Sequence, residues 1–241
     1  MTTPTANSRL AVVAGAGSGI GRACALRLSH MGYAVVMVGR SREKLALVAD
    51  EVQAMGGTAV VYPADVRDWD AMAALGQKVR ESGVDILINC AGGQFAKASD
   101  ELTEGGWKAV VETNLYGSFY LCRHLYPALK KRRGAAVSVV ADIWRRPAPG
   151  LAHSAAARAG VVNLTRTLAK EWAGDGIRVN AVSPGLTNTE ALLETYRELE
   201  DQVPLGRIGA VEEVVDAIVF MAGAGYITGE VLTIDGGMNL T

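Results

Sequence analysis

Short apolar runs alternate with longer segments of helical periodicity along most of the chain. The runs are rich in β-branched residues and are bounded by glycine or polar residues, which is typical of strands buried on both faces of a parallel sheet. We therefore expect seven strands. They are Val12–Val13, Ala34–Val38, Ala59–Tyr62, Asp85–Ile88, Ala136–Val140, Ile177–Val182 and Val231–Ile234.

The segments between these runs repeat apolar residues at the spacing of a helix. The predicted helices are Ile20–Leu28, Leu45–Ala54, Met72–Val79, Trp107–Lys131, Leu151–Trp172 and Val211–Met221. Because strands and helices alternate, right-handed βαβ crossovers should build a parallel sheet with helices on both faces. The pattern predicts a Rossmann-like, doubly wound α/β fold of seven strands, as a single domain over residues 1–241. We expect residues 1–8 to be flexible.

One polar segment interrupts the alternation of strands and helices. From Thr187 to Gln202 the chain has charged residues, few apolar repeats and no glycine. This composition is typical of a mobile insertion, and we expect residues 187–203 to cover the substrate. Phe95, Trp144 and Tyr196 are expected to shape the pocket with it.

A glycine-rich turn joins the first strand to the first helix. It contains Gly15, Gly17, Ser18, Gly19, Ile20 and Gly21. Glycine lets the backbone turn tightly and approach a pyrophosphate, while the free N–H groups and the positive dipole end of the new helix face the anion. The turn therefore predicts a phosphate-bearing ligand. A tight turn between buried elements, with no ligand, is the alternative interpretation.

Arg40 follows the second strand, 19 residues after Gly21, where a dinucleotide fold reads the adenosine ribose. An acidic residue at this point would favour the free 2′-hydroxyl of NAD. A guanidinium matches a 2′-phosphate, so Arg40 with its neighbour Ser41 favours NADP(H) over NAD(H). The alternative is a surface arginine that caps a strand. Asp65 and Asn89 also fall at the carboxyl ends of predicted strands, where ligands of this fold gather.

Composition narrows the class of protein. Nearly half of the residues are hydrophobic and the net charge is −1, so a large core is possible and a nucleic-acid surface is not indicated. The three cysteines have no metal-ligand spacing, which argues against a disulfide framework or a zinc site and fits a reducing cytoplasm. No segment approaches 18 consecutive apolar residues. We expect a cytoplasmic protein with no metal and no membrane span.

Several motifs together carry a family resemblance. They are Ala14-Gly15-Ala16-Gly17-Ser18-Gly19-Ile20-Gly21, Asn89-Cys90-Ala91-Gly92, Asn114, Pro184-Gly185, Leu205-Gly206-Arg207 and Ile234-Asp235-Gly236-Gly237. On these the chain resembles the short-chain dehydrogenase/reductase family over nearly its whole length. The first motif departs from the family's TGxxxGIG by having Ala14 in place of threonine.

The resemblance implies roles for further residues. Asp65, beside Val66, would contact adenine, and Asn89, Ala91 and Gly92 would line the ribose. The nicotinamide carboxamide would be held around Leu186 to Thr189, so the cofactor-binding residues there are Pro184, Gly185, Thr187 and Thr189. The resemblance also implies a homo-oligomer, a dimer or a homotetramer, that pairs through the two long helices and the last strand.

The catalytic positions of the family are not kept. The family uses a serine and a Tyr-x-x-x-Lys pair on one helix face, because the lysine lowers the pKa of the phenol that protonates the carbonyl oxygen. In this chain the matching positions hold Ala141, Ser154 and Arg158, and only Asn114 remains. A shift of one residue would place His153 and Ala157 at the pair, which restores nothing.

The replacements leave the proton donor open. A serine hydroxyl is a far weaker acid than a phenol, and arginine cannot pass a proton, although Arg158 could hold the nicotinamide ribose. The candidate donors are His153, Asp142, the substrate itself, or a water held by Asn114. In the plainer interpretation, Asp142 caps a turn or pairs with Arg145 or Arg146, and His153 is a satisfied surface residue.

Three functions follow from this site. The preferred one is an NADP(H)-dependent oxidoreductase with a non-standard active site that reduces a small molecule with an activated C=N, C=O or conjugated bond. The second is a non-redox cyclase, dehydratase or isomerase on the same scaffold, with Asp142, His153 and Arg158 in acid–base or electrostatic roles. The third is a nucleotide-binding homologue without catalysis.

Overall fold

The structure is a computed structural model that describes residues 8–190 and 199–240. The protein is built on one parallel sheet of seven strands. The strand order is β3-β2-β1-β4-β5-β6-β7, so the chain starts in the middle of the sheet and winds to both edges. The strands are β1 (Leu10–Ala14), β2 (Ala34–Gly39), β3 (Ala59–Pro63), β4 (Ile86–Asn89), β5 (Ala135–Val139), β6 (Arg178–Pro184) and β7 (Val231–Ile234).

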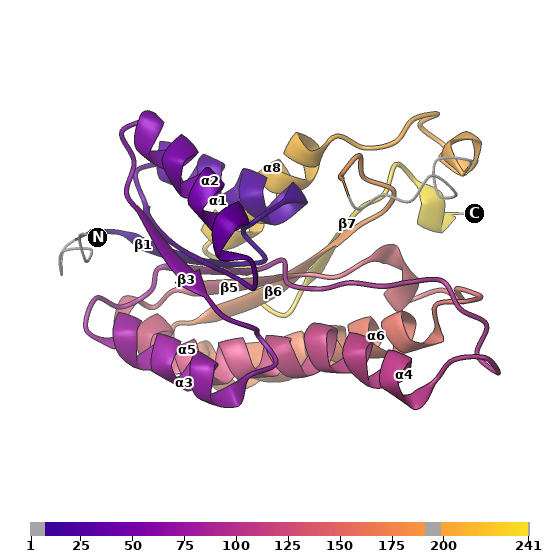
Figure 1. Cartoon of the computed structure of the whole chain (residues 1–241), viewed down its shortest axis with the longest axis horizontal. Helices are drawn as coiled ribbons and strands as arrows, with labels where there is room; N and C mark the ends of the chain where they lie inside the picture. Colours follow the sequence, from indigo (N-terminus) through magenta and orange to yellow (C-terminus); the bar gives the residue numbers. More distant parts are fainter. Residues whose placement is uncertain (1–7, 191–198, 241) are drawn as a thin grey trace.

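Helices cover both faces of the sheet (Figure 1). Helices α1 (Gly19–His30), α2 (Arg42–Ala54) and α8 (Val211–Gly223) pack on one face. Helices α3 (Trp69–Arg80), α4 (Glu104–Val111), α5 (Gly117–Arg132) and α6 (Ala152–Trp172) lie on the other. All five residues of β1 are buried because helices shield the strand from both sides. The predicted Rossmann-like, doubly wound fold is confirmed.

The helix starts differ in how their first amides are satisfied. The side chains of Ser41, Asp68 and Thr103 accept hydrogen bonds from the first turns of α2, α3 and α4, as N-cap residues do. Ser18, at the start of α1, makes no such bond with its side chain. The first turn of α1 is therefore left without a side-chain cap at the place where the sequence predicts an anion.

The long helix predicted over Trp107–Lys131 is interrupted. Between α4 and α5 lies a π-helical turn, η1 (Glu112–Tyr116). A π turn adds one residue to the helix and often marks a functional site. Here the π turn carries Asn114, whose side chain forms a hydrogen bond with the loop after β4. Sequence periodicity did not predict this turn, because a single added residue hardly changes an apolar pattern.

The sixth strand runs two residues beyond the expected Ile177–Val182. Ser183 and Pro184 pair with Thr233 and Ile234 as the last residues of β6. The described residues also form four short 3₁₀ turns: η2 (Asp142–Trp144), η3 (Ala173–Asp175), η4 (Glu200–Gln202) and η5 (Met238–Leu240).

Some expectations fall outside the described residues. They are the flexible start, apart from Ser8, and residues 191–198 of the covering segment, including Tyr196. Among the residues described, no helix has both the length and the apolar character that a membrane crossing requires.

Candidate active site

The glycine turn lies where the ends of β1, β2 and β4 meet. Gly15 has a left-handed φ of 76° and donates its N–H to the Val38 carbonyl, at 2.9 Å. A Cβ atom on Gly15 would lie 2.8 Å from the Cys90 carbonyl, and one on Gly21 would lie 2.1 Å from the Gly15 oxygen. Only glycine fits at these two positions. The close turn and the uncapped start of α1 fit the pyrophosphate of a dinucleotide.

The loop after β6 closes the other side of this turn. A Cβ atom on Gly19 would lie 3.6 Å from Cγ2 of Thr189. Gly185 donates its N–H to the Ile234 carbonyl at 2.8 Å, and the Thr187 hydroxyl donates to the Gly185 carbonyl at 3.3 Å. The segment Pro184 to Thr189 is therefore anchored on β7 and reaches the phosphate turn, as cofactor binding across both would require.

Arg40 is exposed at the end of β2, and after the effects of Arg67 its charge also helps to lower the pKa of Asp65. Ser41 caps α2 and donates its hydroxyl to Glu43 at 2.9 Å. Backbone and Ser41 hydrogen bonds lower the pKa of Glu43. The structure thus leaves the Arg40 guanidinium accessible, whereas the Ser41 side chain is already engaged.

Asp65 and Val66 are held by their neighbours. The Asp65 carboxylate forms an ion pair with Arg67, at 2.7 Å, and the hydrogen bonds from Arg67 lower the pKa of Asp65. Val66 is buried against Gly117 at the start of α5. An adenine contact from Asp65 would have to share that carboxylate with Arg67.

A buried amide network shapes the loop after β4. Asn89 donates to the Ser118 hydroxyl at 2.8 Å and accepts from the Ala91 N–H at 3.1 Å. Asn114 accepts from the Gly93 N–H at 3.0 Å and donates to the Gly93 carbonyl at 2.9 Å. Both ends of the Asn114 amide therefore bind one residue, Gly93, and hold the loop that carries Gly92 and Gln94.

Ser154 and Arg158 do meet, one helical turn apart on α6. Arg158 Nε donates to Ser154 Oγ at 3.2 Å, and Ser154 Oγ donates to Gln94 Oε1 at 3.0 Å. Ser154 is fully buried. Burial lowers the pKa of Arg158 to about 10, against the charge of Asp142, which raises it. The guanidinium also lies beside Gly92, with Nη2 3.6 Å from where a Cβ of that residue would be.

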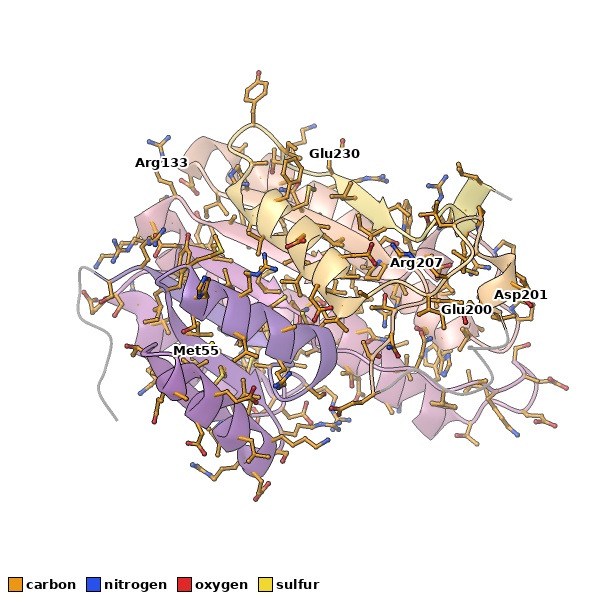
Figure 2. The ribbon with its side chains drawn as sticks, turned by 90° about the horizontal axis from the view of Figure 1, so that it is seen from above. Met55, Arg133, Glu200, Asp201, Arg207 and Glu230 are labelled. Atoms are coloured by element: carbon orange, nitrogen blue, oxygen red, sulfur yellow. The ribbon has the colours of Figure 1, made fainter. Side chains whose placement is uncertain are left out.

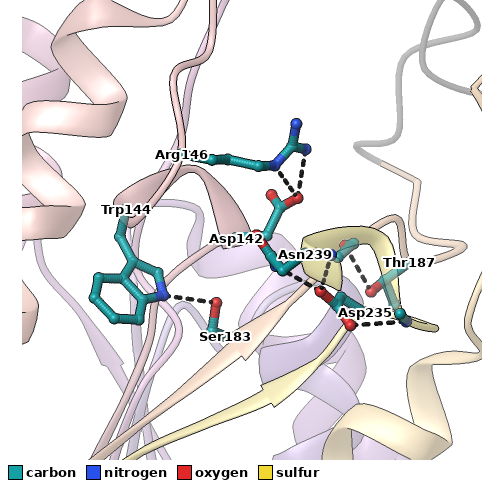
Figure 3. Close-up of polar contacts among 9 residues, drawn as sticks. Asp142, Trp144, Arg146, Ser183, Thr187, Asp235 and Asn239 are labelled. Atoms are coloured by element: carbon teal, nitrogen blue, oxygen red, sulfur yellow. Dashed lines mark hydrogen bonds and ion pairs between the residues drawn. The ribbon is translucent and has the colours of Figure 1, made fainter. Parts of the chain in front are cut away.

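Asp142 pairs with an arginine, which was one of the two predicted alternatives. Arg146 Nε donates to the Asp142 carboxylate at 2.9 Å, and a second bond comes from Nη2 (Figure 3). Asp142 is 7% exposed. Its charge is thus neutralised by Arg146, which weakens the case for this carboxylate as a free proton donor or as the partner of a cationic substrate.

His153 is not a surface residue, and that interpretation was wrong. It is fully buried, and among residues 8–190 and 199–240 neither ring nitrogen has a hydrogen-bond partner. Its ring packs edge-on against Phe95, with 4.6 Å between the centroids. The loop after β4 explains part of this burial, because it carries Phe95 onto the start of α6 and against the His153 ring.

The far side of the site is built from the ends of β6 and β7 (Figure 3). Trp144 donates its indole N–H to the Ser183 hydroxyl at 3.1 Å, which fixes the ring near the end of β6. Asp235 accepts from the N–H groups of Gly237 and Asn239, both at 2.9 Å, and so closes the turn after β7.

A cavity of about 440 Å³ opens beside this turn, between the loop after β6 and the start of α8. The ion pair of Arg207 and Glu213 lines it, with 2.6 Å between the atoms. Figure 2 shows Arg207, Glu200 and Asp201 together at the end of the molecule to which the strands point. The other residues that line the cavity include Leu186, Thr187, Leu205, Val214, Ile234 and Leu240.

Sequence reasoning missed Gln94 and Ser118 as members of this site. Gln94 directly follows Asn89-Cys90-Ala91-Gly92-Gly93, so its place after a glycine pair at a strand end was a usable signal. Ser118 carries no such signal.

Within the described part of the chain, no group of three or more potential ligands could hold a metal ion. Cys24 and Cys90 do come together, and the hydrogen bond between them and burial raise the pKa of Cys90.

Comparisons with known proteins agree with this geometry. Residues 15–239 match the family model described as Enoyl-(Acyl carrier protein) reductase. The chain is 37% identical, over 94% of both chains, to a Bacillus subtilis (strain 168) protein named as a probable 2,4-dienoyl-CoA reductase. It is 36% identical to the 3-oxoacyl-(acyl-carrier-protein) reductase FabG of Thermotoga maritima, over 95% of this chain and 97% of the relative.

Solved structures are similar over almost the whole chain. A short chain dehydrogenase from Bacillus anthracis is 33% identical, with a TM-score of 0.91 and 99% of each chain covered. A candidate NAD(P)-dependent gluconate 5-dehydrogenase from Beutenbergia cavernae, solved with NADP at low occupancy, is 35% identical, with a TM-score of 0.91 and 97% of each chain covered.

Proposed function

This chain belongs to the short-chain dehydrogenase/reductase family of oxidoreductases, and from that premise we propose that it is an NADP(H)-dependent enzyme with a non-standard active site. Its substrate is a small molecule with an activated double bond. The observation that carries the proposal is the buried Ser154 hydroxyl, which donates a hydrogen bond to Gln94 at the position where the family has an acidic phenol.

The lost phenol limits which substrates can be reduced. Reduction of a plain ketone produces an alkoxide, which needs a proton at once, and neither Ser154 nor Arg158 supplies one at neutral pH. A conjugated carbonyl instead spreads the new charge over an enolate, which hydrogen bonds alone can stabilise. An iminium substrate is less favoured, because the Asp142 carboxylate binds Arg146. We therefore place conjugated acceptors first.

The cofactor would be held by residues at three strand ends and on α6. The turn from Gly15 to Gly21 would take the pyrophosphate, Asn89 to Gly92 the ribose, and Pro184 to Thr189 the nicotinamide end. Arg158 would contact the nicotinamide ribose. A bound nicotinamide supplies the hydride, and the chain supplies position and charge.

Arg40 carries the preference for NADP(H). Its guanidinium is exposed at the ribose position and would bind the 2′-phosphate. Replacing Arg40 with alanine is expected to weaken NADPH binding by about tenfold to a hundredfold and to leave NADH binding nearly unchanged. Fluorescence titration with both nucleotides measures this, with the exposed Arg80→Ala on α3 as the matched control. Equal weakening of both nucleotides would contradict the assignment.

A turnover assay tests the reaction itself. The full chain is incubated with NADPH and a panel of enones, enoyl thioesters, imines and plain ketones, and nicotinamide absorbance is followed with product analysis. We expect conjugated acceptors to react and plain ketones to be poor. Product without a change in nicotinamide absorbance would identify a non-redox enzyme instead, and tight NADPH binding with no turnover would identify a binding protein.

A further inference from the structure

The Gln94 side chain occupies the space that a phenol at position 154 would need. Its Oε1 lies 3.0 Å from Ser154 Oγ, the atom attached to the same Cβ from which a tyrosine ring would start. Ser154 is fully buried, whereas Gln94 is exposed on the loop after β4. The loop is held by the two bonds from Asn114 to Gly93. The loop that carries Gln94 is therefore held in place, and the Gln94 amide lies where the acid of the family would stand.

The hydrogen bonds in this cluster have a defined direction. A guanidinium only donates, so Ser154 Oγ must accept from Arg158 Nε, at 3.2 Å. The Ser154 hydroxyl can then use its single proton to donate a hydrogen bond to Gln94 Oε1. This turns the oxygen of the amide towards Ser154 and leaves its Nε2 group on the other side. In the part of the chain that the structure describes, no acceptor binds Nε2.

The chain of donors starts from a charge and ends at a neutral N–H. Arg158 keeps its proton at neutral pH, since its pKa of about 10 lies well above that range. Hydrogen bonds in series polarise one another, and the burial of Ser154 keeps water from the middle of this series. The Arg158 charge should therefore strengthen Gln94 Nε2 as a donor without any proton moving along the chain.

We propose that Gln94 replaces the missing phenol as the group that binds the substrate's carbonyl oxygen, with Ser154 and Arg158 as its positioning residues. The assignment rests on the proposed reductase function. In the reaction, the β-carbon of the conjugated substrate accepts the hydride and the carbonyl oxygen takes up the electron pair of the double bond. Gln94 Nε2 would stabilise that oxyanion, and the α-carbon of the enolate would then take a proton from water, which leaves as hydroxide; a bound reduced nicotinamide would supply the hydride.

Two substitutions at Gln94 separate donation from packing. Gln94→Glu keeps the shape and the acceptor for Ser154 but removes the N–H donors and adds a negative charge. Gln94→Met keeps the length without polar atoms. A donor role predicts that both variants lose about a hundredfold to a thousandfold in kcat on the conjugated substrate, with Glu at least as damaging as Met. A packing role predicts that Glu is the mild substitution.

Matched controls test the position and the chain of bonds. Gln53, exposed on α2, receives the same two substitutions, and kcat should stay within about twofold. Ser154→Ala leaves the Nε2 donors in place but frees the amide, so we expect a loss of about tenfold or less. NADPH affinity of the Gln94 variants should equal that of the unaltered chain, which also reports that they fold.

A binding measurement tests the donor without turnover. In the presence of NADP⁺, 4-nitrophenolate is titrated into each protein, since it is a coloured anion with delocalised charge on oxygen. We expect it to bind the unaltered chain with a shifted absorbance maximum. Gln94→Met should weaken binding by at least about tenfold, and Gln94→Glu by more, with loss of the spectral shift.

The outcomes distinguish the two proposals. If no substrate of the panel reacts but nitrophenolate binding depends on Gln94 in the stated order, the donor assignment stands and the proposed reaction fails. If a conjugated substrate reacts and Gln94→Glu retains kcat, the reaction stands and the donor assignment is wrong. Nitrophenolate binding that is equal in all Gln94 variants also overturns it.

Discussion

Arg158 is a cation in a partly buried place without a carboxylate bound to it. Its bonds within the described residues go to Ser154 Oγ and, at 3.4 Å, to the Val139 carbonyl. Desolvation lowers its pKa to about 10, well below the ordinary value of an arginine, so the folded state holds this charge at a cost. A residue that weakens the fold in this way is typical of a functional site.

Arg158→Met should therefore stabilise the protein while it abolishes function. Removal of the charge removes its desolvation cost, and the loss of two hydrogen bonds offsets part of this gain. We expect the free energy of unfolding to rise by about 1–2 kcal/mol at neutral pH. Thermal denaturation measures the change, and Arg80→Met on the surface of α3 is the control.

The sign of the pH effect gives a second check on Arg158. Because burial lowers the pKa of Arg158 to about 10, the folded protein should lose this proton at a lower pH than the unfolded chain does. The unaltered protein should thus gain stability relative to Arg158→Met as the pH rises above about 10. A less stable Arg158→Met protein at neutral pH would show that the hydrogen bonds outweigh desolvation.

At the scale of an element, the β1–α1 turn has no room for a side chain. Gly21→Ala places a Cβ atom 2.1 Å from the backbone oxygen of Gly15, so the turn must open. We expect a loss of about 2 kcal/mol or more in stability and more than tenfold in NADPH affinity. Gly223→Ala, at the end of α8, meets no atom within 4 Å and should change stability by less than about 1 kcal/mol. Unchanged nucleotide affinity in Gly21→Ala would argue against the turn as the phosphate site.

The start of α8 depends on a single carboxylate. Glu213 accepts from the N–H of Ala210 at 2.8 Å and binds Arg207, and the Arg207 hydrogen bonds lower its pKa to about 2. Because the folded pKa is depressed from 4.5, this stabilisation is present above pH 4.5 and is lost as the pH falls through about 2.

Substitution of Glu213 should remove that pH dependence. Glu213→Ala is expected to lower Tm at neutral pH by about 2–4 °C through loss of the cap. Glu213 should titrate between about pH 5 and pH 2. Over this range the Tm of Glu213→Gln should fall less than the Tm of the unaltered chain. Glu212→Gln, on the same turn, is the control. An unchanged acid limb in Glu213→Gln would exclude this residue as its source.

At the scale of the whole molecule, large apolar side chains are exposed on helices of both faces of the sheet. Trp107, Tyr116 and Phe119 lie on α4, η1 and α5 and are 39–48% exposed, and Phe220 on α8 is 57% exposed. Burial of such groups drives association. We expect a homotetramer, with a light-scattering mass of four times the 25.3 kDa chain.

Charged substitutions should divide that assembly. Phe119→Asp and Phe220→Asp, on helices that cover opposite faces of the sheet, are each expected to give dimers, because a carboxylate in an apolar interface is costly. Lys78→Asp on α3 is a surface control that should leave the mass unchanged. A mass near 25 kDa for the unaltered chain would rule out the oligomer.

Most of the fold could be predicted from the sequence because its signals are local. Apolar runs such as Ala34–Val38 and helical repeats such as Val211–Met221 are found within two residues of the expected ends. The π turn at Asn114 is the exception, since the bonds to Gly93 that accompany it come from a distant segment.

The candidate site was predictable only in part, for the same physical reason. The sequence by itself determined the parallel sheet, the glycine turn and the residue types at Ala141, Ser154 and Arg158, because spacing and chirality act over a few residues. Only the tertiary structure decided what those side chains bind. Ser154 meets Gln94 across 60 positions of sequence because strand order, and not sequence distance, brings the end of β4 to the start of α6.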